Sequence, residues 1–214
     1  MDGNGRWAKM RHLPRAMGHR KGVEAVRTMV RGARDMGLEA LTLYAFSTEN
    51  WRRPEDEISD LMALMKRFIM SDLDEMADNG IRLKIIGDYK AFKPDVVELI
   101  DKALNRTAAN DGTILAVALN YGSQDEIVRA ARAAAAKGEL TTETLGAELD
   151  TADLPPLDLL IRTSGEVWLS NCLLWQAAYA ELYFTDVLWP DFTPDHLAAA
   201  MAEFSQRDRR YGGR

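Results

Sequence analysis

The sequence predicts an α/β fold with a mainly parallel central sheet flanked by helices. Two observations lead to this prediction. Four short apolar runs of β type are separated by segments of helical periodicity, and a polar cluster directly follows each run. The runs cover residues 40–46, 81–86, 113–119 and 157–161. Strands that alternate with helices are typical of parallel sheets, because each crossover needs a helix to return the chain.

The helices between these runs are predicted from apolar residues at helical spacing. Val23, Val26, Val30 and Ala33 repeat in this way, and Gly37 is placed to end their helix. A broad apolar stripe runs from Ile58 to Met76 and is typical of a core-facing helix. It is equally suited to the wall of an elongated apolar tunnel, and the pattern alone does not separate these two interpretations. Further helices are expected at residues 94–109, 124–136, 142–149, 171–178 and 194–207.

Composition narrows the class of protein. The 214 residues are 47% apolar, with no repeat and no linker rich in Pro, Gly or Ser, so we expect a single domain over residues 1–214. One cysteine, Cys172, makes no internal disulfide, and no run reaches the length of a membrane span or resembles a signal peptide. A cytoplasmic location is expected. The net charge of −6 disfavours nucleic-acid binding.

Common hydrolytic sites are also disfavoured. No two of the residues His12, His19 and His196 have the spacing of a zinc-binding pair, and no Gly-x-Ser-x-Gly sequence is present. The polar clusters after the strands are the better candidates for a site. They cover residues 47–51, 87–88, 120–122 and 162–166. Because sites in such sheets form at the carboxyl ends of strands, we expect these loops to converge on one rim.

The basic N-terminal quarter indicates an anion site. Residues 1–53 hold 11 Lys and Arg against 5 Asp and Glu on an otherwise acidic chain. Arg15, His19, Arg20 and Lys21 gather at the start of a predicted helix, where cations are unfavourable unless an anion binds there. A solvated basic face is the alternative, and the pattern leaves it open.

The first residues extend this interpretation. Gly3 and Gly5 flank Asn4, so the backbone can approach a ligand closely, and Arg6 adds a positive charge. These features fit a diphosphate, with Asp2 placed to hold a divalent cation. The segment reads like another loop that follows a strand, although no strand precedes it, so a first strand is expected to be missing.

Several motifs together resemble the cis-prenyltransferase family, and the resemblance covers nearly the whole chain. The motifs are MDGNGRWA at 1–8, Gly18-His19, YAFSTENWRRP at 44–54, IRTSGE at 161–166, LLWQ at 173–176, YAELYF at 179–184 and the tail at 207–213. The family implies a homodimer that condenses isopentenyl diphosphate with an allylic diphosphate, such as farnesyl diphosphate. The implied product is a cis-polyprenyl diphosphate, undecaprenyl diphosphate for the cell wall, delivered to the membrane face.

The resemblance also implies roles for residues at matching positions. Asp2 binds Mg²⁺ and is catalytic, Asn50 has the position assigned to proton removal, and Glu181 is a Mg²⁺ ligand that reaches across the dimer. The remaining positions implied for substrate binding are Gly3, Asn4, Gly5, Arg6, Trp7, Arg15, His19, Ser47, Thr48, Glu49, Trp51, Arg53, Arg162, Trp168 and Ser170. The last three correspond to the isopentenyl diphosphate site.

The chain departs from the family pattern at two motif positions, and the first strand that the family has at the sheet centre, just before Asp2, is expected to be missing. Trp168 stands where the family usually has an arginine that clamps phosphate, and Cys172 stands where phenylalanine is common. Three functions therefore stay open. They are an active long-chain synthase, an enzyme that couples two allylic diphosphates, and a non-catalytic partner subunit or lipid-diphosphate binding module.

Overall fold

The computed structural model describes residues 1–207, which form two compact units. The first unit contains Met1–Ala33, Pro156–Ser170 and the described chain from Leu174 onward. The second contains Arg34–Pro155 and Asn171–Leu173. Residues 208–213 of the tail motif lie outside the described residues, and the expectation of a single domain stays a prediction. No helix among residues 1–207 is long and apolar enough to cross a membrane.

The second unit is built on a three-stranded parallel sheet, in agreement with the prediction. Its strands are β1 (Ala40–Ser47), β3 (Ile114–Tyr121) and β2 (Arg82–Ile86), in that spatial order. β3 lies in the middle and is the most deeply buried strand, with Leu115, Ala116 and Ala118 almost fully covered. Each predicted run lies within two residues of the observed strand.

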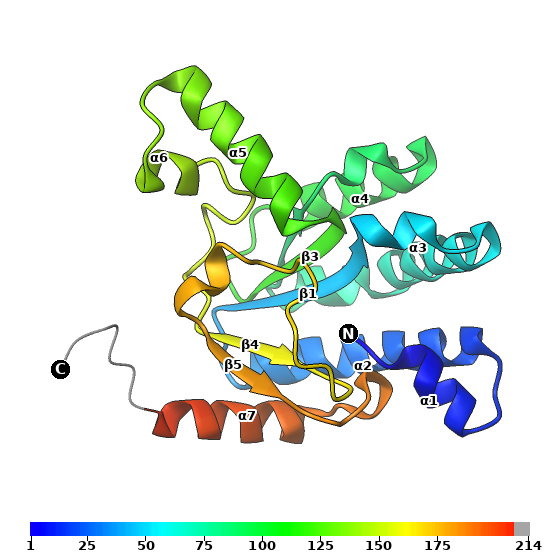
Figure 1. Ribbon diagram of the computed structural model, residues 1–214. Coiled ribbons are helices and arrows are strands. Elements are labelled where there is room, and N and C mark those ends of the chain that lie inside the picture. Colours follow the sequence, from blue (N-terminus) through cyan, green and yellow to red (C-terminus); the bar gives the residue numbers. More distant parts are fainter. Residues whose placement is uncertain (208–214) are drawn as a thin grey trace. The chain divides into compact units, whose positions relative to one another are not determined.

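Two helices cover this sheet with an apolar core. The helices α3 (Glu55–Asp78) and α4 (Pro94–Thr107) lie side by side (Figure 1). Ile69, Leu73 and Ile100 are buried in a cluster that includes Phe46 of β1 and Leu119 of β3. The apolar stripe of α3 therefore faces the core, where its second half is buried. The first half is only partly covered, at Ile58, Leu61, Met62 and Met65.

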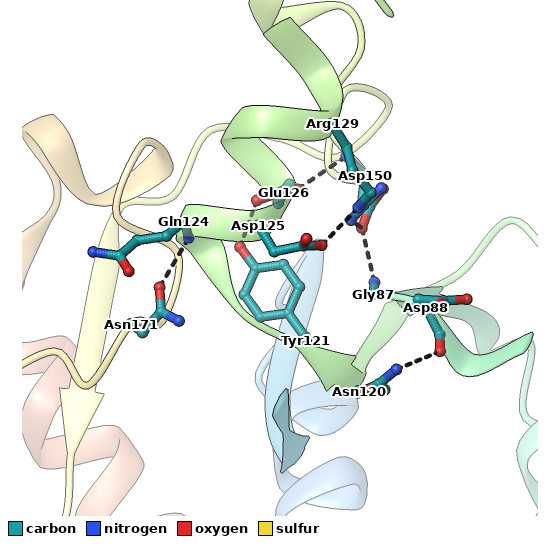
Figure 2. A network of polar contacts seen from close by, with 10 residues as sticks. All are labelled: Gly87, Asp88, Asn120, Tyr121, Gln124, Asp125, Glu126, Arg129, Asp150 and Asn171. Carbon is teal, nitrogen blue, oxygen red and sulfur yellow. Dashed lines mark hydrogen bonds and ion pairs between the residues drawn. The ribbon is translucent and has the colours of Figure 1, made fainter. Parts of the chain in front are cut away.

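A polar network fixes the helix that follows β3. Tyr121, at the end of β3, donates a hydrogen bond to the buried carboxylate of Glu126 in α5 (Ser123–Lys137) (Figure 2). The other Glu126 oxygen accepts from the Asp150 backbone at 3.0 Å. Asp150 in turn accepts from Gly87 N at 2.8 Å, next to the end of β2. Burial and the Glu126 carboxylate raise the pKa of Tyr121 above its ordinary range, so the phenol stays protonated and donates.

The first unit contains the remaining regular elements. The helix α1 (Asn4–Met10) precedes α2 (Arg15–Asp35), whose last two residues belong to the second unit. β4 (Leu159–Arg162) pairs in parallel with β5 (Glu181–Phe184), and α7 (Pro194–Gln206) follows. Short elements complete the two units: α6 (Thr142–Gly146), η1 (Thr48–Arg52), η2 (Tyr89–Ala91), η3 (Gln176–Tyr179) and η4 (Trp189–Asp191).

The sequence prediction was wrong at three elements. Residues 171–178 do not form a helix, because Asn171 and Leu173 have φ of 58° and 48°, in the left-handed region that a right-handed helix excludes. Only the short turn η3 forms there. The segment Asn4–Met10 is a helix rather than a loop, with Gly3 in the left-handed region before it. The short strand β5 was not predicted.

Two glycines of α2 allow α1 to pack against it. A methyl group at Gly18 would overlap the carbonyl oxygen of Asn4, and one at Gly22 would overlap Asn4 Oδ1. Since the first of these obstacles is backbone, it cannot move without displacing the start of α1. The two glycines lie four residues apart and so share one face of α2.

We expect Gly18→Ala to destabilise the chain by about 2 kcal/mol, because overpacking against backbone forces a shift of α1. Thermal denaturation should show a melting temperature lower by roughly 4–8 °C, the range that this loss produces in a chain of this size. Gly146→Ala in α6 is the matched control, because a methyl group there meets open space. Equal melting temperatures for the two variants would contradict the described packing.

Candidate active site

The carboxylate of Asp2 lies against the end of β4. Hydrogen bonds fix the backbone of Asp2. Asp2 N donates to Thr163 Oγ1 at 3.2 Å, and Asp2 O accepts from Ser164 Oγ at 2.6 Å. Trp189 N also donates to Asp2 O, at 2.9 Å. The side chain forms an ion pair with Arg162, with Asp2 Oδ2 at 2.6 Å from Arg162 Nη2. A half-exposed carboxylate and a largely buried guanidinium are thus placed side by side.

A second ion pair holds the guanidinium of Arg6. Arg6 donates to Ser164 O at 2.9 Å and lies 2.9 Å from Glu166 Oε1. The other Glu166 oxygen accepts from the indole N–H of Trp168 at 2.8 Å. This hydrogen bond and the nearby charges of Arg6 and Arg162 hold the pKa of Glu166 below its ordinary value.

Trp168 also contacts Arg162. The guanidinium carbon of Arg162 lies 5.2 Å from the centre of the Trp168 ring, within the range of a cation–π interaction. Arg162 Nε is buried and has no hydrogen-bond partner among the described residues. A buried donor of this kind fits an anionic ligand, which would supply the missing acceptor.

Two glycines of the N-terminal segment make close approaches within the first unit. Gly3 has φ of 100°, and a methyl group there would overlap Ser164 Oγ. Gly5 lies against the Arg15 side chain, and a methyl group at Gly5 would lie 3.2 Å from Arg15 Nε. His19 is buried in α2, whose first turn contains no acidic residue. The structure therefore places Gly3 against Ser164 and Gly5 against Arg15, and the assignment of these residues to a diphosphate stays a prediction.

Trp7 is fixed by a carboxylate that sequence reasoning did not single out. Its indole N–H donates to Asp191 Oδ1 at 2.7 Å, and Arg11 lies over its ring at 4.2 Å. Arg11 also pairs with Asp191 Oδ2 at 3.1 Å. The orientation of Trp7 is therefore set by two groups within the first unit.

The predicted residues of the second unit lie on the loop after β1. Ser47 is buried and caps η1, where Ser47 N donates to Asn50 Oδ1 at 3.1 Å. Arg53 forms an ion pair with Glu57 at 2.7 Å. Three of the four loops expected to converge do so here, because Trp51 bonds to Asn120, and Asn120 bonds to Asp88. The fourth, which follows β4, belongs to the first unit.

The donor set of the first unit fits a magnesium ion held together with a diphosphate. The Asp2 carboxylate is about half exposed, and Mg²⁺ is commonly bound by one or two carboxylates plus substrate phosphates. Glu181, the other carboxylate implied for the metal, pairs with Arg207 at 2.8 Å. Within residues 1–207, no three acidic, His or Cys side chains cluster as a metal site.

The chain belongs to the prenyltransferase family. The family model described as "Putative undecaprenyl diphosphate synthase" matches residues 1–212. An isoprenyl transferase of Zymomonas mobilis is 54% identical over 221 residues, covering 100% of this chain and 89% of that protein. One from Caulobacter vibrioides is 52% identical, covering 100% and 85%. The protein is thus an enzyme of the isoprenyl transferase class by family.

Two solved structures of similar proteins have the fold described above. Lavandulyl diphosphate synthase from Lavandula x intermedia, in complex with dimethylallyl diphosphate, matches with a TM-score of 0.93 and 34% identity. The match covers 99% of this chain and 95% of that one. A probable undecaprenyl diphosphate synthase from Campylobacter jejuni matches with a TM-score of 0.82 and 36% identity, over 90% and 92% of the two chains.

Proposed function

We propose that this enzyme condenses isopentenyl diphosphate with an allylic diphosphate, such as farnesyl diphosphate, into a cis-polyprenyl diphosphate. The observation that carries the proposal is the pairing of the Asp2 carboxylate with the Arg162 guanidinium beside Arg6. A carboxylate can hold a metal ion, and two guanidinium groups can hold diphosphate oxygens. Family membership supports the same reaction class.

In the proposed reaction, the diphosphate group of the allylic substrate leaves as the double bond of isopentenyl diphosphate attacks the carbon that carried that group, and a proton is then lost from the isopentenyl unit. Asp2 would hold Mg²⁺, which would supply positive charge to neutralise the departing diphosphate. Arg6 and Arg15 hold the allylic diphosphate, and Arg162 with Ser170 holds the isopentenyl diphosphate. Asn50, whose Oδ1 is fixed by Ser47 N, is the side chain proposed to assist removal of the proton.

The growing hydrocarbon is proposed to occupy an elongated apolar tunnel. The first half of α3 supports this, because Ile58, Leu61, Met62 and Met65 are apolar and only partly covered. Undecaprenyl diphosphate, a lipid carrier for cell-wall synthesis, is the proposed product. The proposed setting is the cytoplasm, with the product delivered to the inner membrane face.

The enzyme is proposed to act as a homodimer, as one catalytic domain per chain. Glu181 lies on β5, two residues after Tyr179, whose side chain is 75% exposed. Large exposed aromatic side chains beside a carboxylate are typical of a surface that a partner covers. Across such an interface, Glu181 would supply a second carboxylate ligand for Mg²⁺.

The decisive experiment is incubation with farnesyl diphosphate, labelled isopentenyl diphosphate and Mg²⁺, followed by sizing of the labelled product. A polyprenyl diphosphate longer than the primer by several isoprene units is expected. An absence of extended product with farnesyl and with shorter allylic primers would contradict the proposal.

A second candidate is the coupling of two allylic diphosphates. Trp168 favours it, because an uncharged side chain stands at a position that serves the isopentenyl diphosphate. The chain is also similar to lavandulyl diphosphate synthase, whose solved structure contains dimethylallyl diphosphate. Incubation with dimethylallyl diphosphate alone separates the two functions, since only the coupling enzyme forms a ten-carbon diphosphate from it.

A further inference from the structure

Two asparagines fasten the loop that follows β1. Asn171 Nδ2 donates to Glu49 Oε1 at 3.0 Å, and Asn120 Oδ1 accepts from the indole N–H of Trp51 at 2.7 Å. Glu49 and Trp51 stand on either side of Asn50 within η1. The loop is therefore held at two points, one on each side of Asn50.

Each asparagine is itself anchored to a strand end or a helix start (Figure 2). Asn120 Nδ2 donates to Asp88 O at 2.9 Å, beyond the end of β2. At the start of α5, Asn171 Oδ1 accepts from Gln124 N at 2.8 Å. Asn171 O also accepts from Ser123 N at 2.9 Å. Both side chains thus use the separate donor and acceptor atoms of the amide at once.

The backbone at both positions explains why asparagine suits them. Asn120 has φ of 49° and Asn171 has φ of 58°. Asparagine adopts this left-handed region more readily than other residues with a side chain, apart from aspartate and histidine. Glycine at position 122 leaves room for the contacts, because a methyl group there would lie 2.7 Å from Thr48 Oγ1 and 2.9 Å from Asn171 Nδ2.

The contacts with the asparagines affect the pKa of Glu49 and the orientation of Trp51. Burial raises the pKa of Glu49, but hydrogen bonds outweigh it, with the one from Asn171 the strongest, so its pKa lies below the ordinary value. Glu49 is therefore a charged acceptor for Asn171. Trp51 packs against Phe46 at 5.1 Å and Phe92 at 5.7 Å between ring centres, so its orientation is set by both packing and Asn120.

We propose that Asn120 and Asn171 are positioning residues that hold the loop of residues 48–52 and thereby Asn50. The catalytic part of this proposal rests on the proposed function. A single turn of 3₁₀-helix is weak by itself, so the side-chain hydrogen bonds to the residues on both sides of Asn50 decide how long Asn50 stays in one place. Misplacing a reacting group by about 1 Å is enough to reduce turnover strongly.

The test compares Asn120→Gly and Asn171→Gly with the parent chain. Glycine tolerates the left-handed backbone, and it removes the amide together with its Cβ. Hydrogen exchange of residues 47–53 in the substrate-free protein should become about tenfold faster in both variants. At saturating substrates, kcat should fall by about tenfold, with smaller changes in KM.

Asn110→Gly is the control for a purely structural effect. Asn110 donates to Ala77 O at 2.9 Å and to Ile81 O at 2.8 Å, before the start of β3 and away from the loop. This variant also loses two hydrogen bonds, so it should lose stability while the exchange of residues 47–53 and kcat stay at the parent values.

Two further variants, in which aspartate replaces Asn120 or Asn171, test the individual hydrogen bonds. Asn120→Asp keeps an acceptor for Trp51, so most of the exchange protection should return. Asn171→Asp places a carboxylate against Glu49, so protection should fall below that of Asn171→Gly.

Unchanged exchange of residues 47–53 in both glycine variants would overturn the proposal, as would a loss of kcat no larger than that of Asn110→Gly. If the parent chain forms no product, the proposed function fails and the exchange measurement alone decides whether the asparagines hold the loop.

Discussion

Asp2→Ala should reduce turnover by about 10²- to 10³-fold or more, because it removes the carboxylate that is proposed to hold Mg²⁺ at the departing diphosphate. The chain should still fold. The Asp2 contacts that fix the backbone, to Thr163 and Ser164, come from main-chain atoms and survive the substitution. Steady-state turnover of labelled isopentenyl diphosphate provides the measurement.

The structure adds a second consequence for this variant. Arg162 loses its partner at 2.6 Å, and its guanidinium is largely buried, so a modest loss of stability is expected, on the order of 1–2 kcal/mol. Asp2→Asn separates the two effects, since its amide oxygen can still accept from Arg162 while its charge is gone. We expect Asp2→Asn to be as inactive as Asp2→Ala and more stable.

Asp101→Asn is a matched control, because Asp101 is also a half-exposed carboxylate with a cationic partner, Lys90 at 2.7 Å. It lies on α4 and touches none of the proposed site residues, so its turnover should equal that of the parent. Turnover of Asp2→Ala within a few-fold of the parent would remove Asp2 from the mechanism.

The strands and long helices follow from the sequence because their patterns are local. A run such as 113–119 is apolar after Thr113, and the observed β3 is buried on both faces, so the pattern and the burial have the same cause. The helix α3 was predicted for the same reason. Its apolar stripe needs a partner surface, and α4 with the sheet provides it.

The wrong predictions arise where backbone geometry decides and residue type does not. Residues 171–178 are mostly apolar or amide-bearing, with no Gly or Pro to signal a break. The left-handed conformation of Asn171 is stabilised by contacts to a distant segment, the start of α5. At the N-terminus, Gly3 and Gly5 predicted a loop, whereas the segment that contains Gly5 is helical and packs on α2.

The candidate site also contains residues that the sequence could predict and contacts that it could not. Motif positions such as Asp2 and Arg162 could be named from the resemblance, and the structure brings them into contact. The partners that orient them could not be named, because each pairing joins residues far apart in sequence. Glu49 and Asn171 are separated by 122 positions. Asn120 and Glu166 were visible in the predicted loops, but only their contacts reveal what they hold.

Trp168→Arg should lower KM for isopentenyl diphosphate by about tenfold, the equivalent of one charge-assisted contact. An indole offers a single neutral donor, whereas a guanidinium offers about five donors in a fork suited to phosphate. In the parent chain that single donor is already used, because it bonds to Glu166 Oε2 at 2.8 Å.

Glu166 makes the substitution physically reasonable. Its carboxylate already lies beside Arg6 at 2.9 Å and near Arg162, so it offsets part of the charge of a third guanidinium. The introduced fork can keep the bond to Glu166 and still present donors to a diphosphate. KM for the allylic substrate should change little, because its diphosphate is proposed to bind at Asp2, Arg6 and Arg15.

Trp168→Phe is the control that separates charge from packing. It keeps an aromatic ring for Arg162, which lies 5.2 Å from the centre of the present ring, and removes only the bond to Glu166. Its KM for isopentenyl diphosphate should stay near the parent value. Steady-state kinetics with one substrate varied at a time distinguish the three proteins. If Trp168→Arg leaves KM for isopentenyl diphosphate unchanged, position 168 does not contact that substrate, and the coupling of two allylic diphosphates becomes the better description of this enzyme.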